Sequence, residues 1–263
     1  MSQRIEVLKS VWTEVGGLRM HARVALHAAP PGAPAVVLVH GLVVSSRYML
    51  PFARLLARYA RVYAPDLPGF GKSDHPPRPL DIAGLADALA GWMQAIELAN
   101  APLIGNSLGC QVIADLALRY PQLVERAVLV GPTIDRQGRN LLEQARRLLA
   151  ATPWEDASLI GVQLRDTWDA GLRETLGTAR YALADRIEAK LPALPMPVLV
   201  VAGAGDPIAP PRWAQELARL LPRGQLHLLP GAGHALNYSA PEGLLKIVLP
   251  FLNIHTALGA ARN

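Results

Sequence analysis

The stretch Leu103-Ile104-Gly105-Asn106-Ser107-Leu108-Gly109-Cys110 decides the fold of this chain. An apolar run of strand type ends at Gly105. A helical pattern begins just after Ser107 and continues to Tyr120, where Pro121 stops it. The motif Gly-x-Ser-x-Gly therefore places the serine on a sharp strand-to-helix turn. Such a turn exposes the hydroxyl to substrate, and side chains two positions before and after the serine would clash there.

The start of the predicted helix also bears on chemistry. Because the first amides of a helix lack intrahelical partners, the amide of Leu108 points towards negative charge that forms beside the Ser107 hydroxyl. Cys110 is the single cysteine of the chain, which excludes an internal disulfide. Its position one turn into the helix predicts a small buried packing residue and not a second nucleophile.

Length and composition allow one large α/β domain or two small ones, since the chain has 263 residues. Hydrophobic residues make up 51% and charged residues 18%, which is enough for a sheet buried on both faces. The net charge is +5, but the arginines are scattered, Arg146-Arg147 is the only adjacent basic pair, and aromatic residues are only 5%. This pattern argues against a nucleic-acid partner.

The termini and apolar runs predict a cytoplasmic protein without stable membrane insertion. Met1–Glu6 carries charges where a signal peptide needs an apolar segment. The uncharged stretch Leu191–Gly205 contains three prolines and is too short to span a bilayer.

Strand and helix patterns alternate along most of the chain, which predicts a parallel sheet with right-handed crossovers. A hairpin is predicted around Gly16-Gly17. The predicted strands are Ser10–Val15, Leu18–Leu26, Ala35–Val39, Arg61–Ala64, the run ending at Gly105, Ala127–Val130, Val198–Val201 and Gln225–Leu229. The predicted helices are Tyr48–Tyr59, Asp81–Glu97, the helix after Ser107, Arg212–Leu221 and Pro241–Phe251.

The alternation breaks in residues 133–193, where no strand-like run occurs. Leu141, Ala145, Leu148 and Leu149 share one predicted helix face, and Ile160, Leu164 and Trp168 share another. We therefore expect residues 133–193 to form a small helical lid inserted into a core made of residues 1–132 and 194–263.

Nucleotide and metal motifs are absent from the sequence. Gly71-Lys72-Ser73 resembles the end of a phosphate-binding loop, but Asp66 stands where the first glycine belongs. Gly69-x-Gly71 is not a dinucleotide motif either, because Asp74 replaces the third glycine. The histidines other than His40 and His234 (His21, His27, His75, His227 and His255) are dispersed, so no metal or cofactor is expected.

Two further motifs follow the last two predicted strands. Asp206 lies in the turn Ala202–Pro210, and His234 lies in the glycine-rich loop Pro230–His234. Ser107, Asp206 and His234 thus all fall at the carboxyl ends of strands, where open α/β sheets build their sites.

With these motifs, together with His40-Gly41 and the loop Asp66–Asp74, the chain resembles the α/β-hydrolase superfamily over almost its full length. The resemblance implies a mostly parallel eight-stranded sheet with helices on both faces and a lid after the sixth strand. It implies that Ser107 is the nucleophile, His234 the base and Asp206 its orienting carboxylate. The amides of Leu42 and Leu108 are implied as the oxyanion hole. Asp135 is the rival for the acid, because some relatives place it after the earlier strand.

The activity implied first is a carboxylesterase for small to medium apolar esters, with Trp154 and Trp168 of the lid lining the substrate pocket. The alternatives are a carbon–carbon bond hydrolase of aromatic degradation, a lactonase or perhydrolase, and a ligand-binding relative without turnover. Leu42-Val43-Val44 departs from the glycine-rich loop of the carbon–carbon hydrolases, and Ala235-Leu236 replaces their bulky aromatic residue. A small-molecule ester is the expected partner, and the chain is expected to be a monomer or homodimer.

Overall fold

The computed structural model describes residues 8–26 and 29–254. Met1–Glu6, on which the prediction about a signal peptide rests, lies outside these residues, as do His27 and His255. No helix in the described ranges is long and apolar enough to cross a bilayer.

The core is one eight-stranded sheet in the order β1-β2-β4-β3-β5-β6-β7-β8. The strands are β1 Lys9–Val15, β2 Leu18–Ala25, β3 Ala35–Val39, β4 Arg61–Pro65, β5 Ala101–Asn106, β6 Val124–Val130, β7 Val198–Gly203 and β8 Gly224–Leu229. Only β2 pairs antiparallel with its neighbours, β1 and β4, and every other pairing is parallel. The predicted mostly parallel sheet is confirmed.

The sequence explains these strands. β3 and β5 are buried along their whole length, as continuous apolar runs require. The hairpin between β1 and β2 turns at Gly16 and Gly17, which both have positive φ (56° and 79°). That conformation fits the right-handed twist of the two strands, and glycine adopts it without strain.

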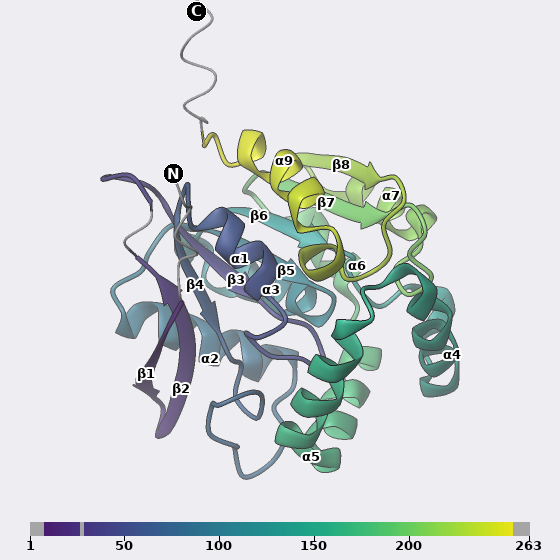
Figure 1. Cartoon of the computed structure of the whole chain (residues 1–263), viewed down its shortest axis with the longest axis horizontal. Helices are drawn as coiled ribbons and strands as arrows, with labels where there is room; N and C mark the ends of the chain where they lie inside the picture. Colours follow the sequence, from purple (N-terminus) through teal and green to yellow (C-terminus); the bar gives the residue numbers. More distant parts are fainter. Residues whose placement is uncertain (1–7, 27–28, 255–263) are drawn as a thin grey trace, which may run out of the picture.

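Helices cover both faces of the sheet (Figure 1). The helices are α1 Leu50–Leu56, α2 Ile82–Ala95, α3 Leu108–Arg119, α4 Leu141–Ala151, α5 Ser158–Ala184, α6 Ile187–Lys190, α7 Pro211–Leu220, α8 Leu236–Ser239 and α9 Pro241–Phe251. One buried apolar cluster joins the sheet to α2, α3 and α7, and a second joins the opposite face to α1 and α9. Both faces of the central strands are therefore shielded from water.

Helix α1 is shorter than the predicted span Tyr48–Tyr59. Residues 46–49 form turns at its start, where the amide of Tyr48 is bonded to the carbonyl of Ser45 at 3.0 Å, and residues 57–59 form turns at its end. The amide of Ser46 donates to the carboxylate of Asp66 at 2.6 Å, so this segment is held by a partner from another loop. Tertiary contacts thus override the local helical pattern.

Between β6 and β7 the chain forms helices only, as predicted. We call residues 133–193 the insertion; it contains α4, α5, α6 and three short 3₁₀ helices. Gly171, with φ 77° and ψ 161°, breaks α5 into two parts, because that conformation is not helical. In Figure 1, α5 lies at the lower centre of the view and α4 at the right. The insertion therefore follows the carboxyl end of β6, the edge to which β5 delivers Ser107.

Candidate active site

Ser107 lies between β5 and α3 in a backbone conformation that few residues adopt (φ 56°, ψ −119°). Glycines on both sides make this turn possible. A Cβ atom on Gly105 would lie 2.7 Å from the carbonyl carbon of Gly109, and one on Gly109 would overlap the carbonyl oxygen of Val39. The close approach of the turn to β3 holds the serine in its strained conformation.

Ser107 lines a cavity, and its hydroxyl lies 3.4 Å from the hydroxyl of Thr133, which follows β6. Leu108 is the first residue of α3, so the helix itself offers no acceptor for its amide. Leu42 lines the same cavity, and a Cβ atom on the neighbouring Gly41 would lie 3.1 Å from the Cβ of Ser107. The two predicted oxyanion-hole residues thus both border the serine.

His40 shapes the loop that carries Leu42. Its Nδ1 donates to the carbonyl of Gly41 at 2.8 Å, and its Nε2 accepts from the amide of Leu67 at 3.0 Å. Burial lowers the pKa of His40, which favours the neutral ring that these two contacts require. His40 is therefore a structural residue of this loop.

The structure brings His234 and Asp206 together at the ends of β8 and β7. The Nδ1 of His234 donates to the Asp206 carboxylate at 2.8 Å, which leaves Nε2 free to accept a proton. The other Asp206 oxygen accepts from the amides of Ile208 at 2.8 Å and Ala209 at 3.0 Å. Burial lowers the pKa of His234, but the negative charges of Asp206 and then Glu155 outweigh it, so the pKa is raised.

Asn106, next to the serine, has a role that the motif alone did not reveal. Its side-chain amide donates to the carbonyls of His234 and Val130, each at 3.2 Å, and its oxygen accepts from the hydroxyl of Tyr48 at 2.9 Å. Asn106 therefore ties the backbone of His234 to the turn that carries Ser107.

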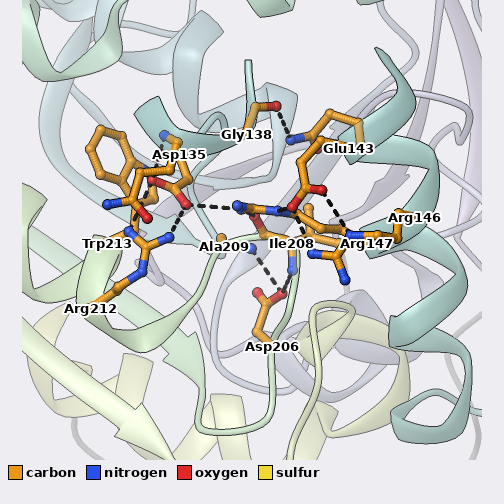
Figure 2. A network of polar contacts seen from close by, with 12 residues as sticks. Asp135, Gly138, Glu143, Arg146, Arg147, Asp206, Ile208, Ala209, Arg212 and Trp213 are labelled. Carbon is orange, nitrogen blue, oxygen red and sulfur yellow. Dashed lines mark hydrogen bonds and ion pairs between the residues drawn. The ribbon is translucent and has the colours of Figure 1, made fainter. Parts of the chain in front are cut away.

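Asp135 is buried in a separate ion network (Figure 2). Within the described residues its carboxylate is hydrogen-bonded to Arg147, Arg212 and the amide of Gln137, whereas His234 binds Asp206. The Asp135 carboxylate binds Arg147 of α4 at 2.9 Å and also binds Arg212 of α7. Arg147 in turn donates to the carbonyl of Ile208 at 3.3 Å. Asp135 thus holds the insertion against the turn that supports Asp206.

The cavity that contains Ser107 and His234 has a volume of about 580 Å³, within the range of small-molecule sites of roughly 300–1,000 Å³. Most of its wall is apolar, and the insertion supplies Leu141, Leu148, Leu149, Leu159, Ile160 and Leu183. Within the described ranges no lysine or arginine lines it, whereas Glu155 and Asp156 do. The wall therefore favours neutral apolar ligands.

The structure places neither predicted pocket tryptophan in this wall. The ring of Trp154 instead packs on the backbone of Gly205, where an added Cβ atom would lie 2.6 Å from the ring, and Trp168 is 87% exposed. The helical pattern could not reveal this, because it does not say which neighbours a face meets. Leucines and Ile160 take the place that the sequence assigned to the tryptophans.

Three arginines of the insertion also lie outside the cavity wall, so they cannot bind a negative group of a ligand there. Arg136 pairs with Glu216, Arg139 binds Glu188 at 2.7 Å, and Arg165 is exposed. Besides Asn106, two polar residues next to Ser107 and His234 were not predicted from the sequence: Thr133 and Glu155. No motif marks them, since each acts through a contact made only in the folded chain.

The sequence of this chain is similar to those of known proteins. Residues 36–247 match the model of the "Alpha/beta hydrolase family". The chain is 30% identical over 261 residues to a 2-hydroxymuconate semialdehyde hydrolase of Pseudomonas sp. (strain CF600), covering 88% of this chain and 90% of that protein.

Two other similarities cover very different shares of the matched proteins. The chain is 29% identical over 245 residues to the polyketide synthase ThaQ of Burkholderia thailandensis, covering 84% of this chain but only 12% of that protein's length. A thermophilic esterase from Thermogutta terrifontis superposes with a TM-score of 0.75 at 23% identity, covering 94% of this chain and 100% of the other. The latter likeness concerns the fold.

Proposed function

The chain belongs to the alpha/beta hydrolase family, and from this premise we propose that it is a serine hydrolase that cleaves carboxylic esters of small to medium apolar substrates. The observation that carries the proposal is that His234, whose ring is paired with Asp206 at 2.8 Å, lines the same apolar cavity as the strained Ser107. A nucleophile, a base and an orienting carboxylate are the parts that acyl transfer needs.

The mechanism follows from these positions. Nε2 of His234 takes the proton of the Ser107 hydroxyl as its oxygen attacks the ester carbonyl, and a tetrahedral oxyanion forms. The amides of Leu42 and Leu108 stabilise that oxyanion, each donor contributing about 3 kcal/mol. His234 then gives the proton to the leaving alcohol, and the acyl group stays on Ser107. Water, activated by the same histidine, releases the acid. Asp206 keeps Nδ1 protonated and stabilises the imidazolium.

The insertion has a part in this proposal as a lid. It supplies most of the apolar cavity wall, including Leu148 and Ile160, and so keeps water from the acyl group. The leucine-rich wall, which has no cationic side chain among the described residues, suits an uncharged acyl or alcohol chain.

The absence of cationic side chains from the described cavity wall favours esters over carbon–carbon cleavage of a dienoate. A dienoate carries a carboxylate and passes through a second anionic intermediate, and Glu155 and Asp156 would repel both. The second candidate function, carbon–carbon bond hydrolysis, is supported by the 30% identity to the 2-hydroxymuconate semialdehyde hydrolase. Lactones and peracid formation use the same steps as esters and need the same residues.

A fluorophosphonate probe and a panel of p-nitrophenyl esters of graded chain length test the proposal. We expect the probe to label Ser107 alone, and Ser107→Ala to abolish labelling and lower kcat by at least about 10³-fold with the fold intact. Labelling at Ser73 or Ser45 would overturn the assignment, and no turnover of any ester would favour a ligand-binding relative.

Selectivity is decided by kcat/KM for the best ester and for a meta-cleavage dienoate on one preparation. We expect the ester to be preferred by a wide margin. A dienoate preferred over every ester would establish the carbon–carbon hydrolase instead.

A further inference from the structure

Glu155, between a short 3₁₀ helix (η3, Thr152–Trp154) and α5 of the insertion, lines the cavity and contacts the loop that carries His234. One oxygen of its carboxylate accepts from the amides of His234 at 2.6 Å and Ala235 at 2.9 Å. The other accepts from the hydroxyl of Ser239 at 2.6 Å. Hydrogen bonds to an ionised acceptor are short and strong, so three of them fix this loop firmly.

The neighbouring Trp154 reinforces the contact. Its ring lies on Gly205, which precedes Asp206, and its Cβ lies where an added Cβ on Gly233 would be 2.6 Å away. Glycine at both positions lets the insertion approach the backbone this closely. The pair Trp154-Glu155 therefore touches both loops that carry the predicted base and acid.

The backbone of His234 is thus held from two sides. Asn106 donates to its carbonyl at 3.2 Å, and Glu155 accepts from its amide. The loop before it contains Gly231 and Gly233, which restrict the backbone little. Without Glu155, the amides of His234 and Ala235 would lose their acceptor, and the ring would lose one of its two backbone anchors.

We propose that Glu155 is a positioning residue for His234, through which the insertion fixes the backbone of the base and places a second negative charge beside its ring. The proposal rests on the proposed function, because it assigns His234 the role of base. It gives the insertion a part in assembling the triad besides covering the cavity.

The charge of Glu155 should affect the pH dependence of activity. The groups that face His234 are the carboxylates of Asp206 and Glu155, and the nearby titratable hydroxyl is that of Tyr48. Both carboxylates raise the pKa of His234. The base works when neutral, so the activity of the wild type rises with pH through this raised pKa. Removing the charge of Glu155 moves that rise to lower pH.

Two substitutions separate geometry from charge. In Glu155→Gln the amide oxygen can accept from both backbone amides and the NH₂ group can donate to Ser239, so the contacts stay and the charge goes. We expect kcat at high pH to be nearly unchanged and the acid limb of the pH profile to shift to lower pH. In Glu155→Ala the anchor is lost, and we expect kcat to fall by about 100-fold with KM little changed, as for a misplaced base.

The matched control is Glu188→Gln, which also removes a carboxylate of the insertion but one that binds Arg139. It should change neither kcat nor the pH profile. If Glu155→Ala does not fold, Glu155→Asp decides: the shorter side chain keeps the charge but cannot reach both amides, so kcat should fall without a shift of the acid limb to lower pH.

The His234 ring titration, followed by NMR without substrate, keeps the test independent of turnover. A midpoint in Glu155→Gln equal to that of the wild type, or full kcat in Glu155→Ala and Glu155→Asp, would overturn the role of Glu155. Failure of the proposed function has a different mark: the wild type itself would turn over no ester and bind no fluorophosphonate, while the NMR midpoint still reports on Glu155.

Discussion

At the residue scale, two buried carboxylates follow neighbouring strands and differ only in their partners. Asp206 follows β7 and binds His234, whereas Asp135 follows β6 and binds two arginines. The sequence placed both near strand ends and favoured Asp206 because of its tight turn. The arginine partners of Asp135 come from α4 and α7, so the sequence around Asp135 could not predict them.

Substitution of the two carboxylates should give opposite results. Asp206→Asn should keep the fold and lower kcat by about 10⁴-fold, because the histidine adopts the wrong tautomer. Asp135→Asn should leave kcat within a few-fold but cost about 2 kcal/mol of stability, because the buried Arg147 loses one of its two counter-charges and keeps only Glu143. Ester kinetics and urea unfolding of both variants measure this. A crippling Asp135→Asn with a mild Asp206→Asn would reverse the assignment.

At the element scale, the loop between β4 and α2 is held by Asp66. Its buried carboxylate accepts hydrogen bonds from the ring Nδ1 of His21 at 2.7 Å and from the backbone amides of Ser46 at 2.6 Å and Lys72 at 2.9 Å. Burial alone would raise the pKa of Asp66, but these contacts lower it to about 2. The motif Asp66–Asp74, which the sequence likened to a hydrolase loop, thus has a clear structural role in fixing the turn before α1.

The pH dependence of stability should reveal this role. Because the pKa of Asp66 is lowered on folding, its contribution is complete above the ordinary pKa and is lost as the pH falls towards about 2. Asp66→Asn should therefore be less stable than the wild type by about 2 kcal/mol at neutral pH, and the difference should shrink to roughly half near pH 3. Urea unfolding across this pH range measures it. A constant difference would contradict the assigned pKa.

Strands and long helices were predicted well because their signals are local. β3 and β5 are apolar runs that the sheet buries completely, and α9 begins and ends where its pattern does. Helix α1 was predicted too long at both ends, and at its start the chain is held in turns by the hydrogen bond from Ser46 to Asp66. The pocket side chains of the insertion were predicted wrongly in part, because a helical period does not fix the direction in which a helix packs.

At the scale of the whole molecule, the insertion is joined to the core by ion pairs between distant parts of the chain. Arg47, just before α1, binds Asp166 and also Asp169, the latter at 2.7 Å, on the first half of α5. Asp166 is only 1% exposed, and burial raises its pKa. Such pairing decides where α5 lies, and a sequence offers no direct sign of it.

Removing one member of this pair should cost more than removing both. Arg47→Met leaves Asp166 buried without its cation and should lower the free energy of unfolding by about 3 kcal/mol. Adding Asp166→Asn removes the stranded charge and should restore a large part of the loss. Thermal and urea unfolding of the two variants form the comparison. Equal stability of the single and double variants would show that Arg47 does not neutralise Asp166.

The close packing behind the serine turn also buries a thiol whose reactivity can report local opening of the structure. Cys110, the single cysteine, is fully buried in α3; its thiol donates to the carbonyl of Gly105 at 3.2 Å, and burial raises its pKa. A maleimide should therefore react only during openings that lift α3 from β5, and the labelling rate should rise with urea as those openings become frequent. Rapid labelling of the native protein would contradict this. The labelling rate of this one thiol thus reports how often the structure around Ser107, the proposed nucleophile, opens, and the measurement needs no substrate.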